Sequence, residues 1–147
     1  TEGHGGFLDG LKAEVAAAGL ADRILFLPEV TVDQMPDWYR SLDIYVAPQR
    51  WEGFGLTPLE AMACGIAVVA TRVGAFEDLV APGVTGALVN PGDVVALGDA
   101  AAGLIDDPAL RAAQADAGRR RAVAQFRIED EAATLVALYR RLLDATP

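Results

Sequence analysis

Short, unbroken apolar runs alternate with helix-like segments along most of this chain. Continuous apolar strands, without polar alternation, are typical of a parallel sheet that is buried on both faces. Strand-helix alternation of this kind predicts an α/β fold, a Rossmann-like parallel sheet with helices on both faces. The expected strands are Ile24–Leu27, Asp43–Ala47, Ile66–Ala70 and Gly86–Val89.

Segments outside these strands are expected to form helices, and residue pairs that favour helix ends indicate where some of the helices begin. Thr31 with Gln34 is typical of a capping box, and Asp107 before Pro108 is typical of an N-cap with a first-turn proline. Gly19 favours the end of the first helix. The expected helices are residues 7–18, a short one through Trp38 and Tyr39, 59–63, 76–80, two that begin after Asp93 and after Asp107, and a last one within 129–147.

Size and charge limit what the chain can bind. Its 147 residues fit one domain, 1–147, and residues 1–6 are polar where such a domain usually opens with a strand, so the sheet is expected to lack its first strand. A net charge of −9 argues against a nucleic-acid partner. A helix N-terminus can still bind a small phosphorylated ligand. No apolar run approaches the ~20 residues of a membrane span.

The most informative segment is the glycine-rich turn that follows the predicted strand 43–47. In open α/β sheets, ligands bind beyond the carboxyl ends of strands. Gly53 and Gly55 allow the backbone to approach a ligand closely, and the free N–H groups of the next helix favour an anion. The segment matches neither the dinucleotide-binding fingerprint nor the Walker loop.

Two carboxylates, Glu52 and Glu60, lie on either side of this turn with seven residues between them. Both are suitable acceptors for the hydroxyl groups of a nucleotide sugar. Glu60 is equally well explained as the last member of a capping box that begins at Thr57. Glu52 has no such structural explanation, although acidic residues are common in exposed loops. Spacing alone therefore leaves a ligand-binding role open for both.

The chain resembles the retaining, family 4 (group 1) glycosyltransferases over nearly its whole length. Its E-x7-E signature is specific, and the part from Ala47 to Met62 looks most like the lipopolysaccharide core mannosyltransferases of that family. The resemblance implies the C-terminal, donor-binding half of a GT-B fold. The matching segments are Glu52 to Gly55, Glu60 to Ala63 with Gly65, Val68 to Thr71, Val73 and Gly74, Gly83 to Gly86, and Pro91 to Asp93.

This resemblance implies a role for each residue of the turn. Glu52 is expected to be the catalytic residue and to contact donor-sugar hydroxyls beside the anomeric carbon. Backbone contacts to the sugar are expected from Gly53, Phe54 and Gly55. The amides of the next two residues, Leu56 and Thr57, are expected to meet the diphosphate.

The nucleoside part of the donor is assigned in the same way. Glu60 is expected to bind the ribose hydroxyls and Val30 to lie against the base. Two departures from the family pattern are visible: Pro28-Glu29 replaces a frequent glycine, and Gly74-Ala75 replaces a frequent Gly-Gly.

The resemblance also implies a reaction and its surroundings. A nucleotide-sugar donor, GDP-mannose, is the expected substrate, and no metal or cofactor is expected. The acceptor, a glycan or a lipid-linked glycan, is expected to bind an N-terminal domain that lies outside this chain, against which residues 129–147 are expected to pack. The fragment alone is then expected to be inactive. The expected location is cytoplasmic, with peripheral association at the inner membrane.

Three other functions fit parts of the sequence. A UDP- or ADP-sugar-dependent synthase of the same fold differs in the donor alone. A non-catalytic nucleotide-sugar-binding module would retain the two glutamates without turnover. A phosphorylase that depends on pyridoxal phosphate is disfavoured, because the chain has one lysine, Lys12, on a polar helix face.

Overall fold

The computed structural model describes residues 2–145, with side chains described for residues 6–145. Residues up to Thr31 form one compact unit and residues from Val32 onward form a second. The first unit contains helix α1, Glu2–Ala17. Gly19, with φ +70°, ends this helix as predicted, because its N–H donates to Ala16 O and the N–H of Leu20 donates to Val15 O, both at 3.0 Å.

The predicted strand Ile24–Leu27 is wrong. Residues 24–31 are neither helix nor strand, and Leu25 is 78% exposed. A strand needs a neighbour that pairs with its N–H and C=O groups, and α1 is the other described element of this unit. The apolar run signalled burial, but it carried no information about a pairing partner.

The second unit contains the sheet, which has three parallel strands in the order β1-β2-β3. Tyr45 of β1 lies opposite Val68 of β2, and Val69 of β2 lies opposite Ala87 of β3. All five residues of the central strand are buried. The three corresponding sequence predictions are confirmed, with bounds of β1 Ile44–Ala47, β2 Ala67–Thr71 and β3 Gly86–Val89.

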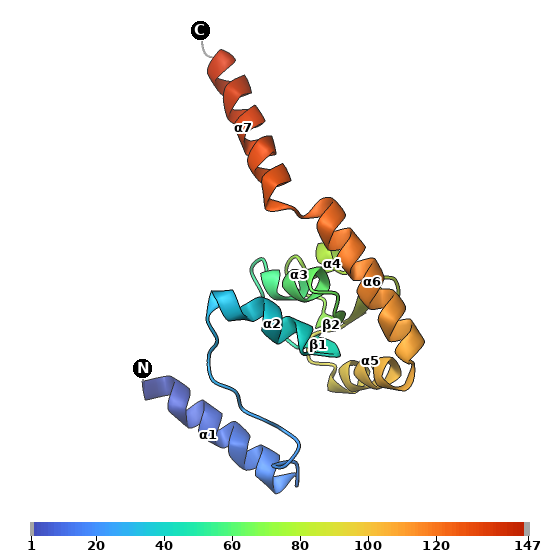
Figure 1. The fold of residues 1–147 in the computed structure, drawn as a ribbon. Coiled ribbons are helices and arrows are strands. Elements are labelled where there is room, and N and C mark those ends of the chain that lie inside the picture. The colour runs from blue at the N-terminus through green and yellow to red at the C-terminus, as the bar shows by residue number, and fades with distance from the viewer. Residues whose placement is uncertain (1, 146–147) are drawn as a thin grey trace. The chain divides into compact units, whose positions relative to one another are not determined.

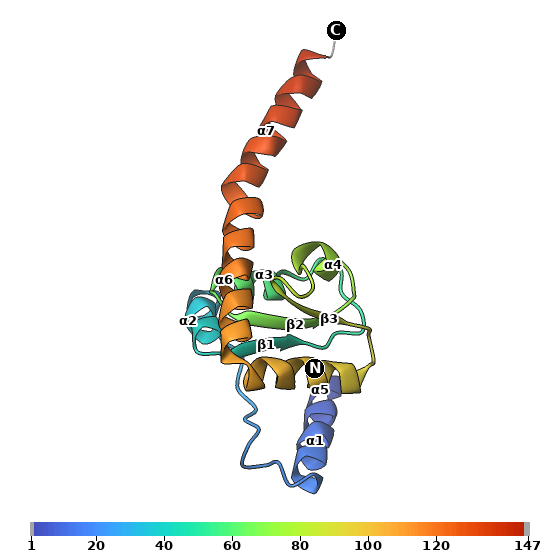
Figure 2. The same cartoon turned by 90° about the vertical axis from the view of Figure 1, so that its right-hand side faces the viewer.

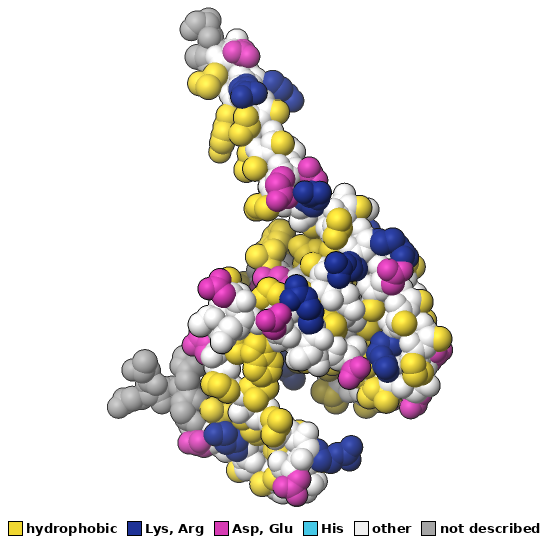
Figure 3. Space-filling view, in the orientation of Figure 1, with side chains coloured by type: hydrophobic (Ala, Val, Ile, Leu, Met, Phe, Trp, Pro, Cys, Tyr) yellow, Lys and Arg dark blue, Asp and Glu magenta, His cyan; other side chains and the backbone are white. Residues whose placement is uncertain are grey.

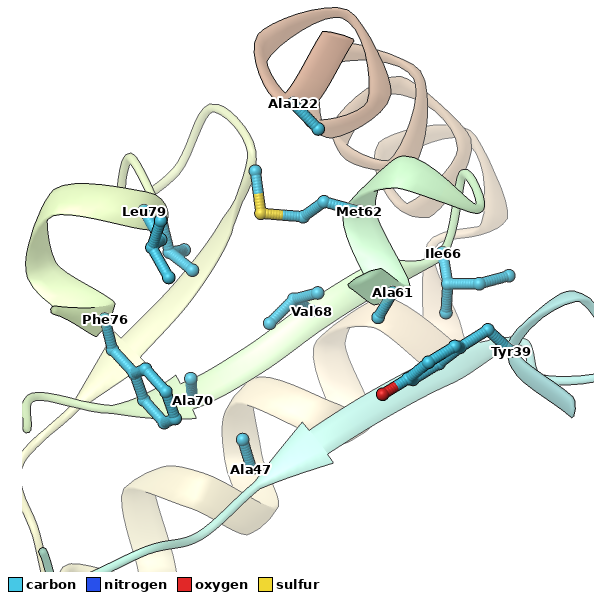
Figure 4. Close-up of a cluster of buried hydrophobic side chains, with 11 residues drawn as sticks. Tyr39, Ala47, Ala61, Met62, Ile66, Val68, Ala70, Phe76, Leu79 and Ala122 are labelled. Atoms are coloured by element: carbon cyan, nitrogen blue, oxygen red, sulfur yellow. The ribbon is translucent and has the colours of Figure 1, made fainter. Parts of the chain in front are cut away.

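Helices cover both faces of this sheet (Figures 1 and 2), so the predicted α/β architecture is confirmed. Successive residues of β2 point to opposite faces, as the pleat requires. Val68 and Ala70 join a core cluster with Met62 and Phe76 (Figure 4). Ala67 and Val69 join a second cluster with Leu104 and other residues of α5. The helices involved are α2 Met35–Arg40, α3 Leu56–Ala63, α4 Phe76–Leu79, α5 Val94–Asp106 and α6 Pro108–Gln125.

The N-caps predicted at Asp93 and Asp107 are confirmed, whereas α2 begins later than Thr31 predicts. Asp93 accepts a hydrogen bond from the N–H of Ala96, and Asp107 accepts one from the N–H of Leu110, both at 2.9 Å. The predicted capping box at Thr31 does not open α2. A 3-10 turn, Val32–Gln34, comes first, and α2 begins at Met35 without a side-chain cap. Pro36 explains the later start, because proline suits the first turn of a helix.

The last helix, α7, spans Ile128–Asp144, and none of its residues is buried. Its stripe of Leu135, Leu138 and Leu142 is exposed by 41–58%. Figure 3 shows hydrophobic side chains along this helix and at its foot. Within the part of the chain that the structure describes, no helix is long and apolar enough to cross a bilayer.

Candidate functional site

The loop between β1 and α3, residues 48–55, lies beyond the carboxyl end of the sheet and is held there by Thr71. The hydroxyl of Thr71 donates to Gln49 O at 2.6 Å and lies 3.4 Å from Ala47 O. Thr71 ends the neighbouring strand β2 and is 2% exposed. A buried side chain of the central strand therefore fixes the start of the loop.

We expect Thr71→Val to destabilise the chain by about 1–3 kcal/mol, because the partly buried Gln49 carbonyl loses its donor. Urea denaturation followed by circular dichroism measures this change. Thr134→Val is the matched control, because the Thr134 hydroxyl donates to Asp130 O at an exposed site on α7. Equal effects of the two substitutions would contradict the anchoring role.

Gly74 lies close to the backbone of the same loop. A Cβ at this position would lie 2.5 Å from Glu52 O and 3.0 Å from Gly53 O, and the φ angle of Gly74 is +51°. Glycine is therefore required at position 74. Its neighbour Ala75 has φ −78°, which any residue adopts, so the departure from the frequent Gly-Gly pair costs nothing here.

Gly55 is the N-cap residue of α3 and has φ +75°. A Cβ at this position would overlap the Phe76 ring and lie 2.7 Å from Cγ of Glu52. Phe76 is fully buried at the start of α4. The glycine-rich turn therefore packs against Phe76, and this contact determines where α3 begins.

The first turn of α3 presents unpaired backbone donors. Leu56 and Thr57 are its first two residues, so their N–H groups have no acceptor within the helix. Pro58 has no N–H, and no side chain caps this end of the helix. The hydroxyl oxygen of Thr57 is also buried without a hydrogen-bond partner. This end of α3 can therefore accept an anionic ligand.

Glu60 does not close a capping box. Thr57 lies inside the helix instead of at its N-cap, because the left-handed Gly55 starts the helix earlier than predicted. Glu60 Oε2 instead accepts a hydrogen bond from the Tyr39 hydroxyl at 2.8 Å. The capping explanation of Glu60 is wrong, and its carboxylate lies on an exposed face of α3.

Glu52 is partly buried, and its Oε1 accepts the N–H of Gly53 at 2.9 Å. It forms no ion pair with any residue that the structure describes. Arg72, at the neighbouring strand end, lies 3.7 Å from a carboxylate oxygen of Glu77 on the surface. The Glu52 carboxylate is therefore not paired with a described basic side chain and can accept further hydrogen bonds.

Exposed apolar side chains surround the turn. Trp51 is 82% exposed, Phe54 60% and Leu56 52%. Phe54, Leu56 and Leu59 line one side of a hollow of about 540 Å³, whose other side is the junction of α6 and α7. The site is open on this side.

Val30 belongs to the first compact unit, so its predicted place against the base stays a prediction. The residues from Glu52 to Glu60 are brought together by the loop and the first turns of α3. Among the described residues, no three His, Cys, Asp or Glu side chains form a potential metal site.

Local sequence patterns do not reveal the supports of this site. The ring of Tyr39 is part of the core, and its hydroxyl reaches the site. No local pattern joins Tyr39 to Glu60, because 21 positions separate them. A polar residue that ends a buried strand, such as Thr71, is the one signal in the sequence that indicates such a support.

Comparison with known proteins gives the family. The profile described as "Glycosyl transferases group 1" matches residues 3–121. The chain belongs to this family. The group 1 glycosyltransferase chain is 55% identical over 143 residues to the lipopolysaccharide core biosynthesis mannosyltransferase LpsB of Rhizobium meliloti (strain 1021). It is 51% identical over 146 residues to the corresponding mannosyltransferase LpcC of Rhizobium leguminosarum bv. viciae. These matches cover 95% and 97% of the chain, which spans 40% of the length of each relative.

Solved structures place the chain in the C-terminal domain of GT-B glycosyltransferases. Sucrose-phosphate synthase from Thermosynechococcus elongatus matches with a TM-score of 0.87 and 35% identity, over 92% of this chain and 34% of that one. The C-terminal domain of a group 1 glycosyl transferase (LpcC) from Francisella tularensis matches with a TM-score of 0.78 and 36% identity. This match covers 83% of this chain and 63% of that one. Anabaena HepE, crystallised with UDP-glucose, matches with a TM-score of 0.83 and 28% identity. This match covers 92% of this chain and 38% of that one.

Proposed function

We propose that this group 1 glycosyltransferase chain binds the nucleotide-sugar donor of a retaining, metal-independent transferase. One observation carries the proposal: the N-terminus of α3 is uncapped by any side chain and follows directly on the glycine-rich turn that holds Glu52. The backbone N–H groups of Leu56 and Thr57 there donate hydrogen bonds to the diphosphate. Glu52 accepts hydrogen bonds from the donor sugar, and Glu60 accepts them from the ribose hydroxyls.

The donor we propose is GDP-mannose, used in lipopolysaccharide core synthesis or a related glycan pathway. Identities of 55% and 51% to two lipopolysaccharide core mannosyltransferases support this choice. A UDP-sugar is the second candidate, since HepE was crystallised with UDP-glucose and shares 28% identity with this chain. Because the base-side residue Val30 lies in the other compact unit, the choice between bases depends on measurement.

In this proposal the departing diphosphate is the group that most needs stabilisation. Charge develops on its oxygens as the glycosidic bond to the sugar breaks, and oriented N–H groups stabilise such charge strongly. Leu56 and Thr57 supply two of these groups from the first turn of α3. The acceptor, a glycan or lipid-linked glycan, binds a second domain, and the apolar stripe of α7 packs against that domain. The intact transferase works in the cytoplasm, peripherally at the inner membrane.

The test is a transfer assay with labelled GDP-mannose, UDP-glucose and ADP-glucose. We expect the intact transferase, in which this chain is joined to its acceptor domain, to transfer mannose from GDP-mannose with no added divalent metal and to be insensitive to a chelator. The 147-residue chain alone is expected to show no transfer. Transfer from UDP-glucose alone would refute the donor, and transfer by the isolated chain would refute the need for a second domain.

A further inference from the structure

The hydroxyl of Tyr39 is the one protein group that holds the carboxylate of Glu60, within the part of the chain that the structure describes. It donates to Glu60 Oε2 at 2.8 Å. No other hydrogen bond or ion pair reaches the Glu60 side chain from the described residues. Glu60 itself is exposed, and a long exposed side chain samples several rotamers unless something holds it. The contact with Tyr39 therefore decides where this carboxylate points.

Tyr39 is a rigid support, because the residue is 5% exposed and belongs to the main core cluster. Figure 4 shows the ring beside Ala61 of α3 and Ile66. It also meets Tyr45 of β1 edge to face, with ring centroids 5.6 Å apart. The ring thus fixes the position of its hydroxyl relative to both α3 and the sheet.

The Tyr39 hydroxyl is a donor under all ordinary conditions. Burial, followed by the hydrogen bond to Glu60, raises the pKa of Tyr39 above its ordinary value of 10. The proton therefore remains on the phenol, and the carboxylate is the acceptor. A bond of this kind to a charged group is stronger than one between neutral groups.

We propose that Tyr39 is a positioning residue for Glu60, and that the pair sets the preference of this site for a ribonucleotide over a deoxyribonucleotide. This inference rests on the proposed function, in which Glu60 accepts the ribose hydroxyls. The geometry leaves room for both partners, since the Tyr39 bond occupies one of about four lone-pair positions on the carboxylate. Oε1 and the second lone pair of Oε2 remain for the sugar diol.

The test compares the dissociation constants of GDP and 2′-deoxy-GDP for the 147-residue chain by isothermal titration calorimetry. We expect the wild-type chain to prefer GDP by about tenfold or more, as for a hydrogen bond to a charged group. Glu60→Gln should reduce this preference to about threefold or less. Tyr39→Phe should lower the preference by about threefold and leave the affinity for 2′-deoxy-GDP nearly unchanged, because it frees the carboxylate without removing it.

Two further variants separate positioning from structural support. Tyr45→Phe is the matched control: it removes a hydroxyl from the ring that Tyr39 contacts, and that hydroxyl has no hydrogen-bond partner among the described residues. It should leave the GDP preference unchanged. In the Glu60→Gln background, Tyr39→Phe should have no further effect on the preference, since residues that act through one another are not additive.

Each outcome decides between the proposals. Two results would overturn the positioning role and leave the proposed function standing. In the first, Tyr39→Phe weakens the binding of GDP and of 2′-deoxy-GDP equally. In the second, Tyr39→Phe keeps the preference for GDP whereas Glu60→Gln loses it. Absence of any GDP preference in the wild-type chain, or its survival in Glu60→Gln, would refute the ribose role of Glu60 and the positioning role with it. Tyr39→Phe is expected to fold, because the buried ring and its packing are retained.

Discussion

Glu52→Gln should lower kcat/KM for sugar transfer by the intact transferase by about 10²–10³-fold, the effect of removing one oriented group that acts on a charged transition state. Glycosyl transfer develops positive charge at the anomeric carbon, and a carboxylate beside the sugar stabilises that charge whereas an amide does not. The substitution keeps the shape of the side chain. Its amide oxygen can still accept the N–H of Gly53, so the loop should remain folded.

The affinity for the nucleotide alone separates catalysis from folding. Because Glu52 is assigned to the sugar, Glu52→Gln should bind GDP as the wild-type protein does. Glu77→Gln is the matched control: it removes an acidic group that lies 3.7 Å from Arg72 and has a side chain 58% exposed. Its transfer rate should be unchanged. A fully active Glu52→Gln variant would favour the non-catalytic interpretation of the two glutamates.

Gly55→Ala should have the largest effect on the structure of the site. A left-handed conformation costs a residue with a Cβ about 1–2 kcal/mol, and overpacking a buried contact adds about 1–3 kcal/mol. The new Cβ would overlap the buried Phe76 ring and approach Glu52. We expect a lower free energy of unfolding and, because the start of α3 must shift, a loss of nucleotide binding.

Gly83→Ala isolates the conformational part of this effect. Gly83 has φ +76°, close to the +75° of Gly55, but a Cβ there meets nothing within 4 Å. Its cost should therefore be limited to about 1–2 kcal/mol, with nucleotide binding retained. Urea denaturation gives the two free energies. Equal losses of stability in the two variants would show that the contact with Phe76 contributes nothing.

The central strand of the sheet was predictable because burial on both faces produces a continuous apolar run in the sequence. β2 reads as a continuous apolar run, and all five of its residues are buried. The segment 24–27 carries the same signal without a pairing partner in its unit, which composition cannot reveal. Helix caps at Asp93 and Asp107 were predictable for a different reason, because a cap depends on residues three positions apart.

The supports of the candidate site were not predictable from local patterns. Thr71 holds a carbonyl 22 positions away, and Tyr39 holds a carboxylate 21 positions away. Both contacts depend on how helices and strands pack. The capping box at Thr57 shows the opposite error: its residues fit the pattern, but the left-handed Gly55 starts the helix earlier and places Thr57 inside it. Short motifs therefore located the site, and tertiary packing determined its geometry.

The most direct test of the central claim is a nuclear magnetic resonance titration of the 147-residue chain. Amide shifts are followed as GDP, UDP, ADP and GDP-mannose are added, with Glu60→Ala as the control variant. The account predicts that GDP and GDP-mannose shift the amides from Gly53 to Glu60, most strongly Leu56 and Thr57, and that Glu60→Ala weakens the response. A folded chain whose amides in this segment do not respond to any of the four ligands at millimolar concentration would contradict it.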